Sequence, residues 1–280
     1  MNELPRHIQE SVRKYKPIVQ DGHALFPVLV SEYTEFLMAR PALEVMQQSF
    51  PVAMLRMPLL SALYQMDFDA VVSGKTPTGL FSRARLVLAL SLRLGAGKEI
   101  AERIEMLQVV VDRRNPRKLI SLRYTNKDGD EKEILPGQYR ELRRIIAAQN
   151  GVKLESDDAN PDIVKAKKDM ASSGGLELDM NVDDLVSAIS ALTQIDESKI
   201  YDWPILKLDK QRTAWERILT YMVCGIGEAS GATWKHGNPV PHPFFQRISD
   251  GGIFSPLGSE SGGTKVPEVI SESAAIASQL

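Results

Sequence analysis

The sequence predicts an α+β protein that is mostly α-helical, with a small antiparallel β-hairpin or three-stranded meander in its middle. Apolar residues recur at intervals of three and four toward both ends of the chain, which is the spacing of amphipathic helices. Between them, residues 119–125 alternate in side-chain polarity and precede a turn sequence, which is the pattern of a hairpin. The 280 residues are 43% hydrophobic and 25% charged, so the chain can bury a substantial core.

The first predicted region, residues 1–153, begins mainly with helices. Residues 24–30 (ALFPVLV) form a short apolar run interrupted by proline, which favours an edge strand because proline cannot donate a ladder hydrogen bond. Ser31 can cap the next helix, and Pro41 suits the first turn of the helix after it. The strongest helix of this part is predicted over Ser82–Leu94, where leucine recurs at every fourth residue before two glycines. We expect this leucine stripe in the core.

A small antiparallel sheet is predicted in the middle of the chain. Leu119–Thr125 pairs with Glu131–Leu135, because Asn126–Asp130 between them supplies residues that tolerate positive φ. Met106–Val111 can add a third strand, since an isolated two-stranded hairpin is marginally stable in water. A helix follows over Gln138–Gln149. Its predicted buried face is Tyr139, Leu142, Ile145 and Ile146, and the arginines expected to face water are Arg140, Arg143 and Arg144.

Three further regions are predicted after the sheet and its helix. Residues 154–180 read as an acidic linker, because the stretch from Leu154 to Glu197 holds eleven acidic residues against three lysines. Residues 181–248 form a C-terminal helical region, in which Asn181 caps the first of two helices. Residues 249–280 are rich in Gly, Ser and Pro, which predicts a flexible tail.

The second helix of the C-terminal region has the widest apolar face in the sequence. Its apolar residues recur at intervals of three and four and are Leu208, Trp215, Ile218, Leu219, Met222, Val223 and Ile226. Because water disfavours such a face, we expect it to pack against another surface.

Composition limits the classes of protein that fit. A single cysteine, Cys224, excludes an internal disulfide framework and a multi-cysteine zinc site, which favours a reducing compartment. The first thirty residues lack the apolar segment of a secretory signal, and no apolar run reaches the ~18 residues of a membrane span. We therefore expect a protein of the cytoplasm that does not associate with membranes.

The sequence motifs assemble no catalytic or cofactor site. Ser73–Thr76 (SGKT) resembles the end of a phosphate-binding loop, but Asp69 stands where that motif needs a glycine and a proline obstructs the helix start. His236 and His242 lack a third metal ligand at suitable spacing, because Cys224 is distant in the sequence. We predict a protein that is not an enzyme and that has neither a metal nor a cofactor.

Two groups of residues are candidates for binding. The candidate partner surface consists of Met54, Met57, Trp234, His236, Phe244 and Phe245. Adaptable methionines suit such a surface, although they can equally fill an irregular core, and the aromatic residues can instead seal the end of the preceding helix. The candidate phosphate contacts are Arg113, Arg114, Arg117 and Lys118.

Those four basic residues lie in a stretch of fifteen residues that contains no acid. A basic edge on the hairpin could contact phosphate, but it also protects an exposed strand from edge-to-edge aggregation. The net charge of −2 and the single interleaved aromatic residue, Tyr124, make nucleic acid an unlikely partner.

Several segments, taken in order, resemble a known class of proteins. They are ALFPVLVSEYTEF near the start, PLLSALYQMDF, the continuous helix sequence from Arg140 to Val152, Asn160-Pro161, and YDWPI before the long tryptophan-bearing helix. From about Ala24 to Phe245 this order resembles tail-region proteins encoded in phage and prophage virion modules. More narrowly, it is similar to the tail-assembly chaperone class made next to the tape-measure protein.

The resemblance implies a non-enzymatic assembly factor that binds an unassembled tail component, such as the tape-measure or tube protein, in the host cytoplasm. One alternative is a structural tail or baseplate protein, which would be found in the virion. Another is a nucleic-acid-binding protein that uses the basic edge of the hairpin. Association into a homo-oligomer is compatible with each of them.

Overall fold

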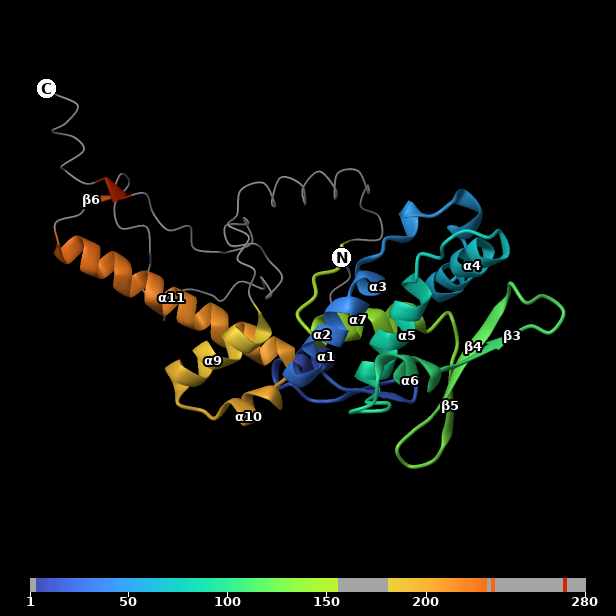
Figure 1. Ribbon diagram of the computed structural model, residues 1–280, viewed down its shortest axis with the longest axis horizontal. Helices are drawn as coiled ribbons and strands as arrows, with labels where there is room; N and C mark the ends of the chain where they lie inside the picture. Colours follow the sequence, from blue (N-terminus) through green and yellow to red (C-terminus); the bar gives the residue numbers. More distant parts are fainter. Residues whose placement is uncertain (1–3, 156–180, 231–232, 235–268, 271–280) are drawn as a thin grey trace, which may run out of the picture.

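The predicted fold class is confirmed. A computed structural model describes residues 4–155, 181–230, 233–234 and 269–270 as a mostly helical α+β protein (Figure 1). The helices are α1 (Arg6–Arg13), α2 (Tyr33–Ala39), α3 (Pro41–Glu44), α4 (Leu59–Val72), α5 (Leu80–Ser91), α6 (Ile100–Glu105), α7 (Tyr139–Gln149), α9 (Val182–Thr193), α10 (Glu197–Tyr201) and α11 (Ile205–Ala229). The strands are β1 (Ile18–Gln20), β2 (His23–Leu25), β3 (Gln108–Val111), β4 (Leu119–Thr125), β5 (Glu131–Ile134), β6 (Thr233–Trp234) and β7 (Val269–Ile270).

Helix α5 lies at the centre of the main core. It contacts α2, α3, α4 and α6, and all residues from Leu86 to Ser91 are buried. A helix that is apolar on nearly every side has to be enclosed, because water disfavours each of its faces. The predicted leucine stripe is therefore confirmed, although the helix begins earlier than predicted, at Leu80, and ends at Ser91.

The predicted hairpin and its third strand are also confirmed. Strands β3, β4 and β5 form an antiparallel sheet in that order, and Leu122 of β4 pairs with Ile134 of β5. Both side chains are fully buried. At the hairpin turn, the Oδ1 atom of Asn126 accepts hydrogen bonds from the backbone N–H groups of Asp128 (2.9 Å) and Asp130 (2.8 Å). These side-chain bonds hold the turn that joins the two strands.

Helix α7 has the predicted apolar face, but one of the arginines that the sequence places toward water is buried. Tyr139, Leu142, Ile145 and Ile146 are buried as predicted. The expectation that Arg143 faces water is wrong, since its side chain is buried and donates to the carbonyl oxygens of Leu43 (2.6 Å) and Val45 (2.7 Å). These carbonyls lie at the C-terminal end of α3, where helical partners run out, and a long guanidinium group can satisfy them.

The predicted edge strand over residues 24–30 is correct only at its start. β2 pairs with β1 as far as Leu25, and Val30 already begins a 3₁₀ turn (Val30–Glu32) that replaces the predicted Ser31 cap. Pro41 does open α3 as predicted. The backbone after Leu25 bonds to other elements: the N–H of Phe26 donates to Ser91 O (2.7 Å), and that of Val28 donates to the Asn150 side chain (2.9 Å).

A second, smaller core joins α9, α10 and the beginning of α11. It contains Val186, Ile189, Ile200 and Leu208. Asn181 caps α9 as predicted, because its side chain accepts the N–H of Asp183. The prediction of two helices is wrong by one, since the short helix α10 lies between α9 and α11. Figure 1 shows α11 extending away from the helical body beyond α9 and α10.

The two cores are connected through backbone hydrogen bonds. The N–H of Val30 donates to Trp203 O (2.8 Å), and the N–H of Ile205 donates to Val28 O (3.0 Å). Ile205 is itself fully buried in the main core. The first turn of α11 is therefore fixed to the body on both its backbone and its apolar side.

Within the described ranges, no helix combines the length and the apolar character needed to cross a membrane.

The buried role of Arg143 can be tested by comparing R143M with R144M. Arg143→Met removes the donor from the buried carbonyl of Leu43 and the half-buried carbonyl of Val45, so we expect the free energy of unfolding to fall by about 2–3 kcal/mol. Arg144 lies on the same helix in a partly exposed pair with Glu141 (3.0 Å), so R144M should change it by less than about 1 kcal/mol. Urea unfolding followed by circular dichroism measures both, and equal losses would contradict the assigned role.

Candidate functional site

Helix α11 carries one apolar stripe along its 25 residues. The stripe follows from side chains that recur at intervals of three and four, which places them on one face of the helix. Its members are Ile205, Leu208, Trp215, Leu219, Met222, Val223 and Ile226.

The first half of this stripe is covered. Ile205 and Leu208 are fully buried, and Trp215 packs against the second core beside α9 and α10. The expectation that this helix packs against another surface is confirmed for this half.

The second half of the stripe is open. Leu219 is 46% exposed, Met222 53%, Val223 63% and Ile226 64%. These four residues lie in the C-terminal half of α11. Exposed apolar side chains that lie together mark a binding surface more often than scattered ones do. We call these four residues the open face of α11.

The open face lies in an uncharged part of the helix. From Ile218 to Gly227 the sequence has no acidic or basic residue. A partner that binds here thus gains by excluding water from apolar groups and has no ion pairs to form along this stretch.

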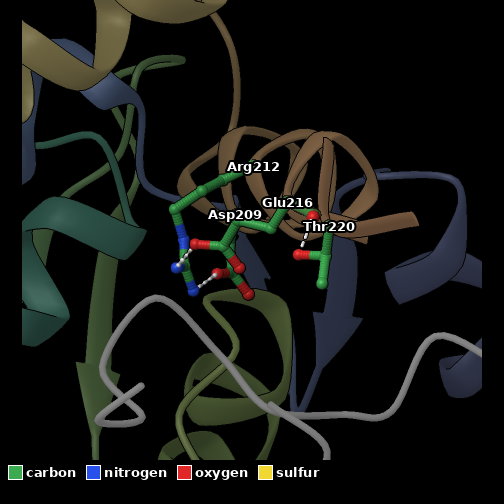
Figure 2. A network of polar contacts seen from close by, with 4 residues as sticks. All are labelled: Asp209, Arg212, Glu216 and Thr220. Carbon is green, nitrogen blue, oxygen red and sulfur yellow. Dashed lines mark hydrogen bonds and ion pairs between the residues drawn. The ribbon is translucent and has the colours of Figure 1, made fainter. Parts of the chain in front are cut away.

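Charged residues are concentrated instead in the first half of α11, which we call its root. Figure 2 shows a network of four side chains there. The guanidinium of Arg212 bonds to Asp209 (3.3 Å) and to Glu216 (2.5 Å). The hydroxyl of Thr220 donates to the backbone carbonyl of Glu216 (2.7 Å). Because Asp209 and Arg212 are buried, breaking their pair would leave an uncompensated charge away from water. Burial raises the pKa of Asp209 to about 6, although Arg212 opposes the shift.

The candidate partner residues from the sequence do not lie together in the described parts of the chain. Met54 and Met57 are half-buried and pack against the main core, while the neighbouring Val52 is 83% exposed. Trp234 lies in β6, paired with Val269 of β7. His236, Phe244 and Phe245 are outside the described residues.

The candidate phosphate contacts are brought into one loop. Arg113, Arg114, Arg117 and Lys118 are all exposed in the connection between β3 and β4. Arg117 forms a two-pronged pair with Asp69 of α4, at 2.9 and 2.6 Å. Side-chain hydrogen bonding to Asp69 raises the pKa of Arg117. Asp69 therefore offsets part of the positive charge that the sequence assigned to this loop.

Residues 73–76 lie in the loop between α4 and α5, before a helix start that is already occupied. The carboxylate of Asp67 accepts the backbone N–H groups of Gly79 and Phe81, both at 3.1 Å. A phosphate would need these same donors at the positive end of the helix. In the part of the chain that the structure describes, no three His, Cys, Asp or Glu side chains are placed to hold a metal ion.

No protein-family model matches the chain, and no curated protein and no solved structure was found to be similar to it.

The sequence indicates which residues form the open face but not that they are exposed. Periodicity identified its residues as one side of a helix, but it did not show that the covering elements end near Trp215. The available signal was length: α11 has 25 residues, whereas α9 has 12 and α10 has 5. Such short helices cannot cover the whole stripe.

The burial of Asp209 predicts an unusual pH dependence of stability. Its pKa lies above the ordinary 3.8, so the folded state holds this proton more tightly than the unfolded state. We expect the free energy of unfolding of the wild type, relative to D209N, to fall as the pH rises from about 4 to 7. Urea unfolding across this range measures the difference.

An exposed acid provides the control. Hydrogen bonds from Ser198 lower the pKa of Asp196, so the wild type should gain stability relative to D196N as the pH rises through the acid range. A D209N difference that does not change with pH, or that changes in the same direction as D196N, would contradict the burial of Asp209 as a cause.

Proposed function

We propose that this chain is a non-enzymatic phage tail assembly factor that acts like a chaperone and binds an unassembled tail component. The open face of α11 is the observation that carries this proposal. A factor of this kind needs an apolar surface that is available to a client before the client reaches its final place. The sequence resemblance to tail-region proteins supplies the class of client, a tape-measure or tube protein.

The size of the open face suits reversible binding. Complete burial of one large aliphatic side chain contributes about 1.5–3 kcal/mol, so covering four that are about half exposed contributes roughly 3–6 kcal/mol. Part of this gain is offset by the cost of association. An assembly factor has to release its client, so moderate affinity is an advantage for it, whereas a permanent virion component would need a larger interface.

The basic loop supports a second candidate function, nucleic-acid binding. Arg113, Arg114 and Lys118 are exposed on one loop, where they could reach phosphate groups. Against this stands the pairing of Arg117 with Asp69 and of Arg123 with Glu133 (3.4 Å), which reduces the positive field of the hairpin.

Affinity capture in cells that produce the particles tests the proposal. We expect the tagged wild-type chain to co-purify with the tape-measure or tube protein from the lysate and to be absent from finished particles, as judged by mass spectrometry. L219E/I226E places charge on the open face and should reduce the captured client at least about tenfold. The matched control is V19E/V52E, which changes two valines that are 70% and 83% exposed elsewhere, and it should capture the client normally.

Other outcomes identify the alternatives. A fixed number of copies in the particle would indicate a structural component. Salt-sensitive binding to DNA or RNA that is lost in R113E/R114E would indicate the nucleic-acid function. Absence of the chain from both the particle and any complex with a tail protein would contradict the phage assignment.

A further inference from the structure

The apolar stripe of α11 follows a heptad repeat over the length of the helix. Counting from Ile205 as an a position, the a residues are Ile205, Arg212, Leu219 and Ile226, and the d residues are Leu208, Trp215, Met222 and Ala229. A repeat of seven with apolar a and d positions is the pattern that packs one helix against another in a left-handed supercoil. One a position is polar, and the two terminal nitrogens of Arg212 there pair within its own helix with Asp209 and Glu216.

This repeat is occupied in its first half and open in its second. Ile205, Leu208 and Trp215 already contact the body or the second core, whereas Leu219 and the residues after it on the stripe are exposed. Ala229 is exposed as well and continues the d positions to the end of the described helix. Gly225 borders the open half, and no atom lies within 4 Å of where its Cβ would be, so a second helix can approach closely.

We propose that the open half of α11 pairs with the same segment of a second copy of this chain, in antiparallel orientation. The orientation follows from where the body lies. A parallel pair would bring two roots together, and each root already carries α9, α10 and the body (Figure 1). An antiparallel pair overlaps only at the exposed ends and keeps the two bodies apart. Met222 then lies opposite Ile226 of the second copy, and Leu219 lies opposite Ala229 of the second copy.

The distribution of charge favours a second copy as the occupant. Coiled-coil helices that select a different partner do so largely through charges beside the seam, at the e and g positions. Here the e position is Val223 and the g positions are Ile218 and Gly225, so the open half carries no such charges. Two identical uncharged segments can approach each other without like-charge repulsion, and an isologous pair needs only one surface that complements itself.

The small area implies a weak dimer. About three turns of helix per copy place the interface at the low end of specific contacts, below about 1,200 Å² in total. We therefore expect a monomer–dimer equilibrium that depends on concentration. Self-pairing stands independently of the proposed function. That a second copy would protect the open face until a client replaces it rests on the proposed function.

Sedimentation equilibrium of the full chain tests the pairing. The wild type should pass from a mass of 31.1 kDa at low micromolar concentration toward twice that value at high concentration. L219E/I226E should remain monomeric, or associate at least about tenfold more weakly. V19E/V52E should dimerise as the wild type does, and circular dichroism should show all three folded.

The possible results separate the pairing from the client-binding function. A wild type that stays at 31.1 kDa at every concentration would overturn self-pairing, and client capture would remain a separate measurement. A dimer that persists in L219E/I226E would also overturn it, because the contact would then lie elsewhere. Conversely, a dimer that is lost in this variant, without client capture by the wild type, would support the pairing and count against the proposed function.

Cysteine cross-linking tests the antiparallel orientation. In a C224S background, a mixture of L219C and A229C should form a disulfide between the two variants on mild oxidation, because these positions face each other. L219C alone should not, because its two copies would be separated by ten residues along the axis, about 15 Å. That distance is too long for a disulfide, which needs Cα atoms within about 7 Å. Efficient self-cross-linking of L219C would overturn the antiparallel arrangement.

Discussion

Burial of α5 on nearly all sides is the constraint on which the rest of the structure depends. Enclosing a helix between other short helices buries helix ends, and the last carbonyl groups of each helix then need donors. Three arginines supply them. Arg85 donates to the carbonyls of Ile104 in the last turn of α6 and Leu107 just after it (both 2.7 Å). Arg103 donates to that of Leu94 after α5 (3.1 Å), and Arg143 donates to those of Leu43 in α3 and Val45 just after it. The apolar core thus depends on long cationic side chains that satisfy its polar edges.

The same enclosure fixes the start of α11. The backbone carbonyl of Ser91, at the end of α5, accepts a hydrogen bond from the N–H of Phe26. The backbone just after Phe26, at Val28 and Val30, forms hydrogen bonds with the Asn150 side chain and with the backbone of Trp203 and Ile205. One stretch of backbone therefore joins the centre of the body to the first turn of the long helix. The charged network of Asp209, Arg212 and Glu216 then stiffens the next turns through pairs three and four residues apart. The open face is consequently presented on a helix with an anchored root.

Local patterns were sufficient for much of the fold and for the residues of the open face. The hairpin follows from strand alternation and a turn that contains Asn126, Asp128 and Gly129, and the apolar side of α7 follows from its periodicity. Periodicity shows which residues share a face, but the length of chain that covers the face depends on contacts distant in sequence. For this reason periodicity places Arg143 toward water, and composition leaves Met54 and Met57 open between a binding surface and the core. Leu219 and Ile226, by contrast, belong to a face that the sequence predicts to be covered, and neither is part of the second core.

The contrast between the two halves of α11 suggests how one helix can serve two purposes. At the root, buried ion pairs are costly to break, so they favour a single arrangement. At the exposed end, contacts are purely apolar and cover few turns, so they can form and separate with little reorganisation. Because no charges flank this stretch, neither a second copy nor another apolar helix meets like-charge repulsion there. The proposed second copy and the proposed client would then compete for the same residues, and their concentrations relative to their dissociation constants would decide which one is bound.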